Sequence, residues 1–157
     1  MSIKLSILDP SPIVSGHSAA EALSRTRELA LAADEMDYRS FWVQEHHNTE
    51  SFAGTAPEIM MADLASRTKR LQLGSGGIML PNYSPLKVAE ISTTLSALYP
   101  GRIEIGLGRA TGADPRASAA LLGPVLASFL RAKGGFELLF TTLGGLSLVS
   151  CALAATL

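Results

Sequence analysis

Short apolar segments alternate with longer amphipathic segments along most of this chain. Four segments have the length, apolar content or period of two that is typical of β-strands. They cover residues 3–8, 41–44, 71–77 and 102–107. Three longer segments carry apolar residues at helical spacing, which predicts α-helices. They begin near residues 18, 55 and 84. Asp114-Pro115 is expected to cap a fourth helix, so strands and helices alternate throughout.

Local signals support the predicted helix starts. Residues 18–21 (Ser-Ala-Ala-Glu) and 55–58 (Thr-Ala-Pro-Glu) both fit the capping box, in which a hydroxyl and a carboxylate pair with each other's backbone amides. Pro57 falls in the first helical turn, where a missing amide is tolerated. Ser84-Pro85 gives a similar start to the third helix, and Tyr99-Pro100-Gly101 is expected to form the turn after it.

This alternation predicts an α/β fold with about four parallel strands joined by right-handed helical crossovers. Two architectures fit the pattern: half of an eight-stranded barrel, and a small doubly wound sheet. The periodicity alone does not choose between them. In both, the carboxyl ends of the strands meet at one rim, where ligands bind.

The composition changes abruptly near residue 123. Only three charged side chains, Arg131, Lys133 and Glu137, follow that point, and residues 138–157 carry none. We therefore expect a domain over residues 1–123 and an atypical apolar tail over 124–157. The tail has three interpretations: a frameshift or truncation scar, a membrane segment, or a cap that completes a half-barrel. The glycine pairs at 134–135 and 144–145 disfavour the membrane helix.

Charge and cysteine content exclude several partner classes. The net charge is −1 and the sequence has no basic stripe, so nucleic acid is not expected as a partner. The single cysteine, Cys151, excludes an internal disulfide and any CxxC metal site. A reducing cytoplasm is the expected location, and the first residues lack the long apolar run of a signal peptide.

Candidate chemistry stands at the ends of the predicted strands. The strand ends carry Asp9, Glu45-His46-His47, Gly74–Gly77 and Gly108-Arg109. Histidine titrates near neutrality and can transfer protons, so the adjacent histidines are candidate catalytic residues. The structural alternatives are a loop histidine bonded to backbone and a core imidazole held by Glu45. No metal site is expected, because His17 is the only other histidine.

The glycine-rich strand ends are candidate ligand contacts. Gly74-Ser75-Gly76-Gly77 lets a flat or anionic ligand approach the backbone, although a tight turn would need the same residues. The segment lacks a GxGxxG dinucleotide fingerprint leading into a helix. Arg109 is suited to a phosphate or carboxylate, and its structural alternative is an ion pair with Asp114 or Glu104.

Four separated motifs over about residues 3–122 resemble one family, the bacterial-luciferase-like flavin-dependent monooxygenases. The motifs are Leu5-Ser6-Ile7-Leu8-Asp9 followed by Ser11-Pro12, Trp42-Val43-Gln44-Glu45-His46-His47-Asn48 with Ala53-Gly54-Thr55-Ala56-Pro57-Glu58, Gly74-Ser75-Gly76-Gly77-Ile78-Met79-Leu80-Pro81, and Pro100-Gly101-Arg102-Ile103-Glu104-Ile105-Gly106-Leu107-Gly108-Arg109.

The resemblance implies the N-terminal half of a TIM (β/α)8 barrel, in a family whose members are usually homodimers that bind reduced FMN. It implies catalytic roles for His46, Glu45 and His47. It places the backbone of Gly76 and Gly77, often joined by a cis peptide, against the flavin ring system. It also places Gly108 and Arg109 near the flavin phosphate. Some relatives use the deazaflavin F420 instead, and the sequence does not decide between the cofactors.

The implied function is oxidation of a small organic substrate by reduced FMN and dioxygen, with a flavin reductase as the FMN-reducing partner. The family's barrel needs about twice this length, and strands five to eight are missing from the sequence. The alternative is therefore an inactive truncated fragment that acts as a weak flavin-binding or dimerising module. The substrate cannot be derived from this half.

Overall fold

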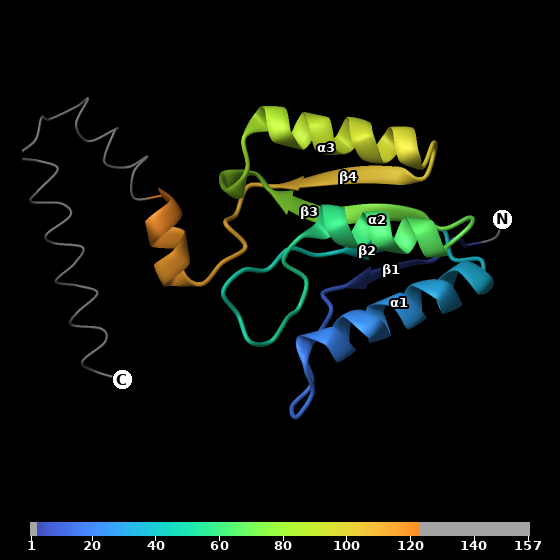
Figure 1. The fold of residues 1–157 in the computed structure, drawn as a ribbon, viewed down its shortest axis with the longest axis horizontal. Helices are drawn as coiled ribbons and strands as arrows, with labels where there is room; N and C mark the ends of the chain where they lie inside the picture. Colours follow the sequence, from blue (N-terminus) through green and yellow to red (C-terminus); the bar gives the residue numbers. More distant parts are fainter. Residues whose placement is uncertain (1–2, 123–157) are drawn as a thin grey trace, which may run out of the picture. The chain divides into compact units, whose positions relative to one another are not determined.

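The computed structural model describes residues 3–122, in which four strands alternate with helices (Figure 1). In chain order the elements are β1 (Ser6–Asp9), α1 (Ala19–Glu35), β2 (Ser40–Val43), α2 (Pro57–Arg67), β3 (Gln72–Met79), the short 3-10 helix η1 (Leu80–Asn82), α3 (Pro85–Leu98) and β4 (Ile103–Gly108). A further helix begins at Pro115, as expected from the Asp114-Pro115 signal. The predicted alternation of strands and helices is confirmed.

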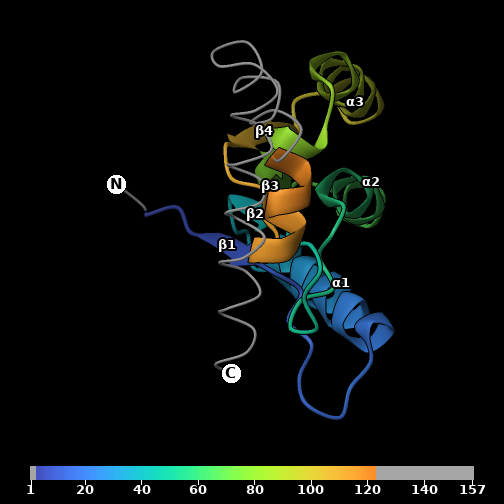
Figure 2. The ribbon, with the colours of Figure 1, turned by 90° about the vertical axis from the view of Figure 1, so that its left-hand side faces the viewer.

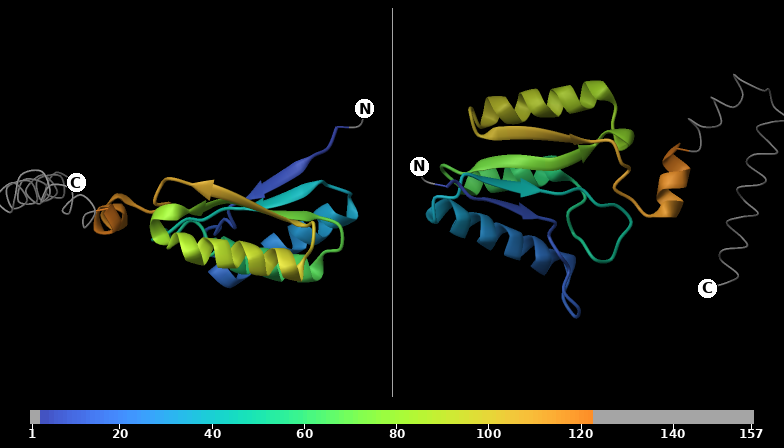
Figure 3. Two further views of the ribbon diagram at one scale, coloured as in Figure 1. Left: turned by 90° about the horizontal axis from the view of Figure 1, so that it is seen from above. Right: turned by 180° about the vertical axis from the view of Figure 1, so that it is seen from behind.

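The four strands form one parallel sheet in the order β1-β2-β3-β4. Helices α1, α2 and α3 all lie on the same face of this sheet (Figures 2 and 3). A doubly wound sheet reverses its strand order and carries helices on both faces, whereas each strand of a β/α barrel lies beside the next one in the chain. The structure therefore selects the half-barrel from the two predicted architectures.

The core lies between the sheet and the three helices. Alternate strand residues face the helices, as the period of two requires, so Phe41, Val43 and Leu73 are buried against α1 and α2. The helices supply small or flexible side chains at these contacts: Ala30, Ala33, Met60, Met61 and Leu64. The small alanines allow α1 to approach the sheet closely. This packing fixes the positions of the strand ends.

The helix starts agree with the sequence signals in two of three cases. Ser18 forms the expected capping box with Glu21, and Ser84 caps α3 by accepting a hydrogen bond from the Lys87 amide. The capping box expected at Thr55 is wrong: the cap residue is Ala56, which makes no side-chain cap bond. Because Pro57 takes the first helical position, the Thr55 hydroxyl stands one residue too early.

The predicted end of the third strand is also corrected by the structure. Residues 74–77 do not end the strand but lie inside β3, which continues to Met79. Gly74 is required there by packing, because an added Cβ would lie 2.4 Å from the ring of Trp42 on β2. The glycines therefore shape the sheet itself, and the strand ends at the turn of η1 that follows.

The predicted tail, residues 124–157, lies outside the described residues, and so do the domain boundary at 123 and the three interpretations of the tail. Within residues 3–122, none of the helices combines the length and the apolar character that crossing a membrane would require.

Candidate active site at the carboxyl ends of the strands

Both histidines lie just beyond β2, in a loop whose backbone is held on two sides. The His46 amide donates to the carbonyl of Gly54 at 2.8 Å, and the His47 amide donates to the carbonyl of Gly112 at 2.7 Å. Since β2 ends at Val43, the two side chains do not have to point to opposite faces of the sheet. Both line the same hollow.

Glu45 is fully buried and accepts hydrogen bonds from three donors. His47 Nε2 donates to Oε1 at 2.5 Å, Asn82 Nδ2 donates to Oε1 at 3.0 Å, and the Met79 amide donates to Oε2 at 2.9 Å. A buried carboxylate is stable only when it is paired in this way. Glu45 therefore ties the end of β2 to the end of β3 and fixes the His47 ring.

His46 has a different environment from His47. Its ring packs against Phe52 with the centroids 4.6 Å apart and the planes inclined by 37°. Its Nδ1 atom is buried and has no hydrogen-bond partner among the described residues. Of the two structural alternatives considered for the pair, an imidazole held by Glu45 applies to His47 and not to His46. A buried nitrogen without a hydrogen-bond partner is unfavourable unless a ligand or a water molecule supplies that partner.

A hollow of about 430 Å³ opens beside these histidines. We call it the rim hollow. It is formed by the loop after β2 and the loop after β4. Its lining residues are His46, His47, Asn48, Thr49, Phe52, Ala110, Thr111, Gly112, Ala113 and Asp114. The expected meeting of strand ends at one rim is thus confirmed for β2, β3 and β4, through the contacts of Glu45 and His47.

The peptide bond between Gly76 and Gly77 is cis, in agreement with what the family resemblance implies. The two glycines have different surroundings. Gly77 is buried against β4, where an added Cβ would lie 2.9 Å from the Gly106 carbonyl oxygen. Gly76 is exposed on the face away from the helices, and the nearest atom to an added Cβ would be Leu8 Cδ1, at 3.1 Å. Gly76 thus offers accessible backbone, while Gly77 lets β3 and β4 pack closely.

Gly108 is the last residue of β4, and Arg109 follows it directly. An added Cβ on Gly108 would lie 2.5 Å from Met79 Sδ, so this glycine accommodates the methionine. Arg109 is exposed and is not part of the rim hollow. Within residues 3–122 it forms no ion pair with Asp114 or Glu104. The Asp114 carboxylate instead accepts hydrogen bonds from Asn48 and from backbone amides of the helix that follows. These bonds, the one from Asn48 first, hold the pKa of the Asp114 carboxyl below its usual range.

Two residues of this site were missed by sequence reasoning. Asn82 donates to both Glu45 Oε1 and the Thr111 carbonyl, each at 3.0 Å, so it joins the loops after β3 and β4. Tyr83 lies nearby, and burial first, then the charges of Glu45 and Glu58, raise the pKa of its hydroxyl. The available signal was a polar Asn-Tyr pair directly after an apolar strand and a proline.

Asp9, at the end of β1, is also buried, but it turns toward α1. Its carboxylate accepts from the Thr26 hydroxyl at 2.6 Å, and its backbone carbonyl accepts from the Gln44 amide at 3.3 Å. Asp9 therefore supports the start of the Glu45 segment through the backbone. Its side chain is a contact between sheet and helix.

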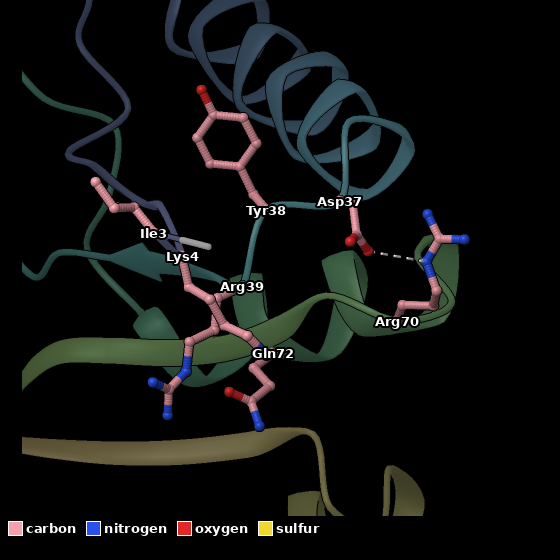
Figure 4. A pocket seen from close by; sticks show the side chains of 7 residues that line it. All are labelled: Ile3, Lys4, Asp37, Tyr38, Arg39, Arg70 and Gln72. Carbon is pink, nitrogen blue, oxygen red and sulfur yellow. Dashed lines mark ion pairs between the residues drawn. The ribbon is translucent and has the colours of Figure 1, made fainter. Parts of the chain in front are cut away.

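A second hollow, of about 620 Å³, lies at the opposite, amino ends of the strands. Figure 4 shows its side chains, which include Lys4, Arg39 and Gln72 from the first three strand starts, and the Asp37–Arg70 ion pair at 3.8 Å. It contains no histidine, and the acidic residue there is already paired. Among the described residues, no group of histidine, cysteine and acidic side chains is arranged to hold a metal ion.

Parallel strands in chain order, helices on one face and polar residues gathered at the carboxyl rim define the class: the N-terminal half of a β/α-barrel enzyme fold. The comparisons narrow this class. A family model described as luciferase-like monooxygenase matches residues 3–120. The chain belongs to this luciferase-like monooxygenase family.

Individual relatives agree with the assignment. A luciferase-like monooxygenase of Escherichia coli K12 is 50% identical over 119 residues, which is 76% of this chain and 36% of the relative. Among solved structures, apo-MsnO8 has a TM-score of 0.72 and 47% identity, covering 76% of this chain and 36% of that one. The oxygenating constituent of 3,6-diketocamphane monooxygenase from Pseudomonas putida, in complex with FMN, has a TM-score of 0.67 and 26% identity, with coverages of 76% and 32%. This chain therefore spans about a third of the length of these relatives.

Proposed function

We propose that this chain carries the amino-terminal part of an FMN-dependent monooxygenase site, which acts on a small organic substrate with dioxygen. The observation that carries the proposal is His46 Nδ1, a buried nitrogen without a partner among the described residues, in a loop that lines the rim hollow. Family membership supplies the reaction class. The proposal includes a homodimer and a flavin reductase that supplies reduced FMN.

The described residues fit a flavin in two respects. Gly76 exposes backbone on the face away from the helices, where a flat ring system can approach it without side chains. His46 offers the unpaired nitrogen close to the rim. When bound, reduced flavin supplies the electrons that activate dioxygen. Gly108 and Arg109 are the proposed phosphate contacts, since an exposed guanidinium at a strand end is free to bind an anion.

The three residues of the Glu45-His46-His47 segment have separate proposed roles. His46 is the catalytic residue, which holds or transfers a proton at Nδ1 next to the substrate. Glu45 is a positioning residue, because its carboxylate is fully buried and occupied by three donors. His47 donates from Nε2 to Glu45, and this bond orients its ring at the wall of the rim hollow.

A second function is favoured by the length of the match. The match covers 36% of the E. coli relative, and the described residues supply four strands. A fragment that binds flavin weakly, without turnover, is the alternative.

The two functions differ in oxygen consumption. We expect the purified chain to quench FMN fluorescence and, with reduced FMN and an aldehyde, to consume dioxygen faster than free reduced flavin does. H46A should abolish the added consumption and leave the fold intact by circular dichroism. The matched control is H17A, because His17 is exposed and pairs with Glu21 and Arg25 at the start of α1. Quenching without added consumption supports the fragment, and no quenching refutes both.

A further inference from the structure

The sheet has one face that α1, α2 and α3 leave uncovered (Figures 2 and 3). We call it the bare face. The bare face carries even-numbered strand residues that pair with one another across the sheet. Ser6 pairs with Ser40, and Leu8, Trp42, Gly74 and Glu104 form one continuous row. Leu8 is 56% exposed, and Trp42 lies over Gly74 and Gly106. In a closed barrel this face would be the packed interior.

Among residues 3–122 the sheet also ends in two open edges, since β1 and β4 each pair with one described strand. Unpaired parallel edges favour association with further strands. In a β/α barrel every strand pairs with the next in order, and closure joins the last strand to the first. A second copy placed by a two-fold axis meets this condition, because β4 of each copy then lies beside β1 of the other. All eight carboxyl ends would then meet at one rim, as in a single-chain barrel.

The register of the sheet, combined with the stagger of an ideal eight-stranded barrel, predicts which residues of the two copies would meet. A barrel of eight strands staggers by about eight residues on one full turn, so each half of a two-fold barrel staggers by about four. The ladder runs in register from Leu8 through Trp42 and Gly74 to Glu104. Because barrel strands have a right-handed tilt, the line of paired residues that starts at Leu8 of one copy reaches β1 of the other copy nearer its amino end. The displacement along β1 is the stagger of about four residues. Glu104 of one copy therefore meets the second copy's residue 4, which is a lysine.

We call the contact between β4 of one copy and β1 of the other the seam. The charges at the seam are complementary. Lys4 is exposed, and Glu104 stands on the edge strand β4. Within residues 3–122, neither residue forms an ion pair. The pairing of β1 with the chain before β2 already extends one residue beyond the start of β1, because the Arg39 amide donates to the Leu5 carbonyl at 2.8 Å. The strand can thus carry Lys4 into the ladder.

From the bare face, the open edges and this charge pairing, we propose that two copies of the chain close into one eight-stranded barrel, with Lys4 of each copy beside Glu104 of the other. This interface deepens the proposed function, since it specifies how the proposed homodimer would form, and it can be tested without flavin. It would complete the wall of the site, which one copy forms only in part.

The main rival is a dimer through the helices. A groove between α2 and α3 is lined by Ile59, Ile91 and Leu98, and Leu98 is 61% exposed. Such a dimer would leave the bare face and both edges open. Variants at the seam and in the groove therefore separate the two interfaces.

The test is sedimentation velocity of the full chain without flavin, together with the emission of Trp42, the only tryptophan. We expect wild type to dimerise and its emission to shift to shorter wavelength as concentration rises. K4E and E104K should each weaken dimerisation by about tenfold or more, since each places like charges at both seams. An equimolar mixture of K4E and E104K should restore it, because opposite charges then meet at both seams. L98E is the control and should dimerise like wild type.

Three results would overturn the proposal: a monomer at all concentrations, a dimer that K4E and E104K leave unchanged, or a mixture that associates no better than the single variants. Loss of the dimer in L98E alone would assign the interface to the helices. Circular dichroism of each variant separates loss of association from loss of folding. Since no flavin is present, a failure here is distinct from a failure to bind FMN.

Discussion

The buried carboxylate of Glu45 allows a quantitative prediction about what holds the rim together. In E45Q the side chain keeps its shape but has only one oxygen. If that oxygen takes the place of Oε1, it still accepts from His47 and Asn82, but the Met79 amide faces an NH2 group. One buried donor without an acceptor costs about 1–3 kcal/mol.

The two remaining bonds also weaken in E45Q, because hydrogen bonds to a charged acceptor are about twice as strong as neutral ones. Adding about 0.5 kcal/mol for each gives a loss of about 2–4 kcal/mol in the free energy of unfolding. That is a large part of the 5–15 kcal/mol typical of a folded domain. The effect should be strongest at the rim, where Glu45 joins the segments after β2 and β3.

Urea unfolding followed by far-UV circular dichroism measures this loss. The matched control is E50Q, the same change at an exposed glutamate in the loop that follows, which should alter the free energy of unfolding by less than about 0.5 kcal/mol. If E45Q were as stable as E50Q, the three donors would not stabilise the fold, and the role of Glu45 as the tie between strands would be refuted.

Two further predictions concern other contacts of the sheet. G77A should lose about 1–3 kcal/mol of stability, because its methyl group would lie 2.9 Å from the backbone of β4. In G76A the nearest atom is the movable end of the Leu8 side chain, so this variant should lose less. Thermal unfolding of the two variants measures the difference, and equal losses would contradict the prediction. Burial opposes ionisation of Asp34, but the amides of residues 69–71 more than offset it and lower its pKa. Because the pKa of Asp34 is lower in the folded state, the ionised carboxylate stabilises the fold above the ordinary carboxyl range, and this stabilisation is lost as pH falls through the folded pKa. D34N should therefore be less stable than wild type by about 1–2 kcal/mol at pH 7 and nearly as stable as wild type at acid pH. A difference that stays constant with pH would exclude the charge as its cause.

Periodicity was sufficient to predict the order of elements, because alternate burial along strands such as residues 41–43 and the helical spacing of Thr26, Ala30 and Ala33 follow directly from backbone geometry. The choice between barrel and doubly wound sheet was not predictable from that pattern. It depends on which strands are neighbours, and the same alternation is compatible with either order.

The sequence was also sufficient to locate the rim, but not to assign a separate role to each residue there. Glu45, His46 and His47 are adjacent in the chain, yet one is a buried tie, one packs on Phe52 with an unpaired nitrogen, and one is oriented by the first. The role of Glu45 arises from contacts with residues 34 to 37 positions further along, Met79 and Asn82, which no local pattern specifies. The glycines of β3 show the same effect: Gly74 is required by Trp42 on the neighbouring strand and not by a turn.

The rim, and not another part of the sheet, is the proposed flavin-binding site. Amide NMR spectra of the 15N-labelled chain, recorded as FMN is added, test it residue by residue. We expect shifts at His46, Gly76 and Gly112 and none at the amino ends of the strands, where Lys4 and Arg39 line the other hollow. Spectra that do not change at the rim, or that change only around Lys4 and Arg39, would contradict the claim.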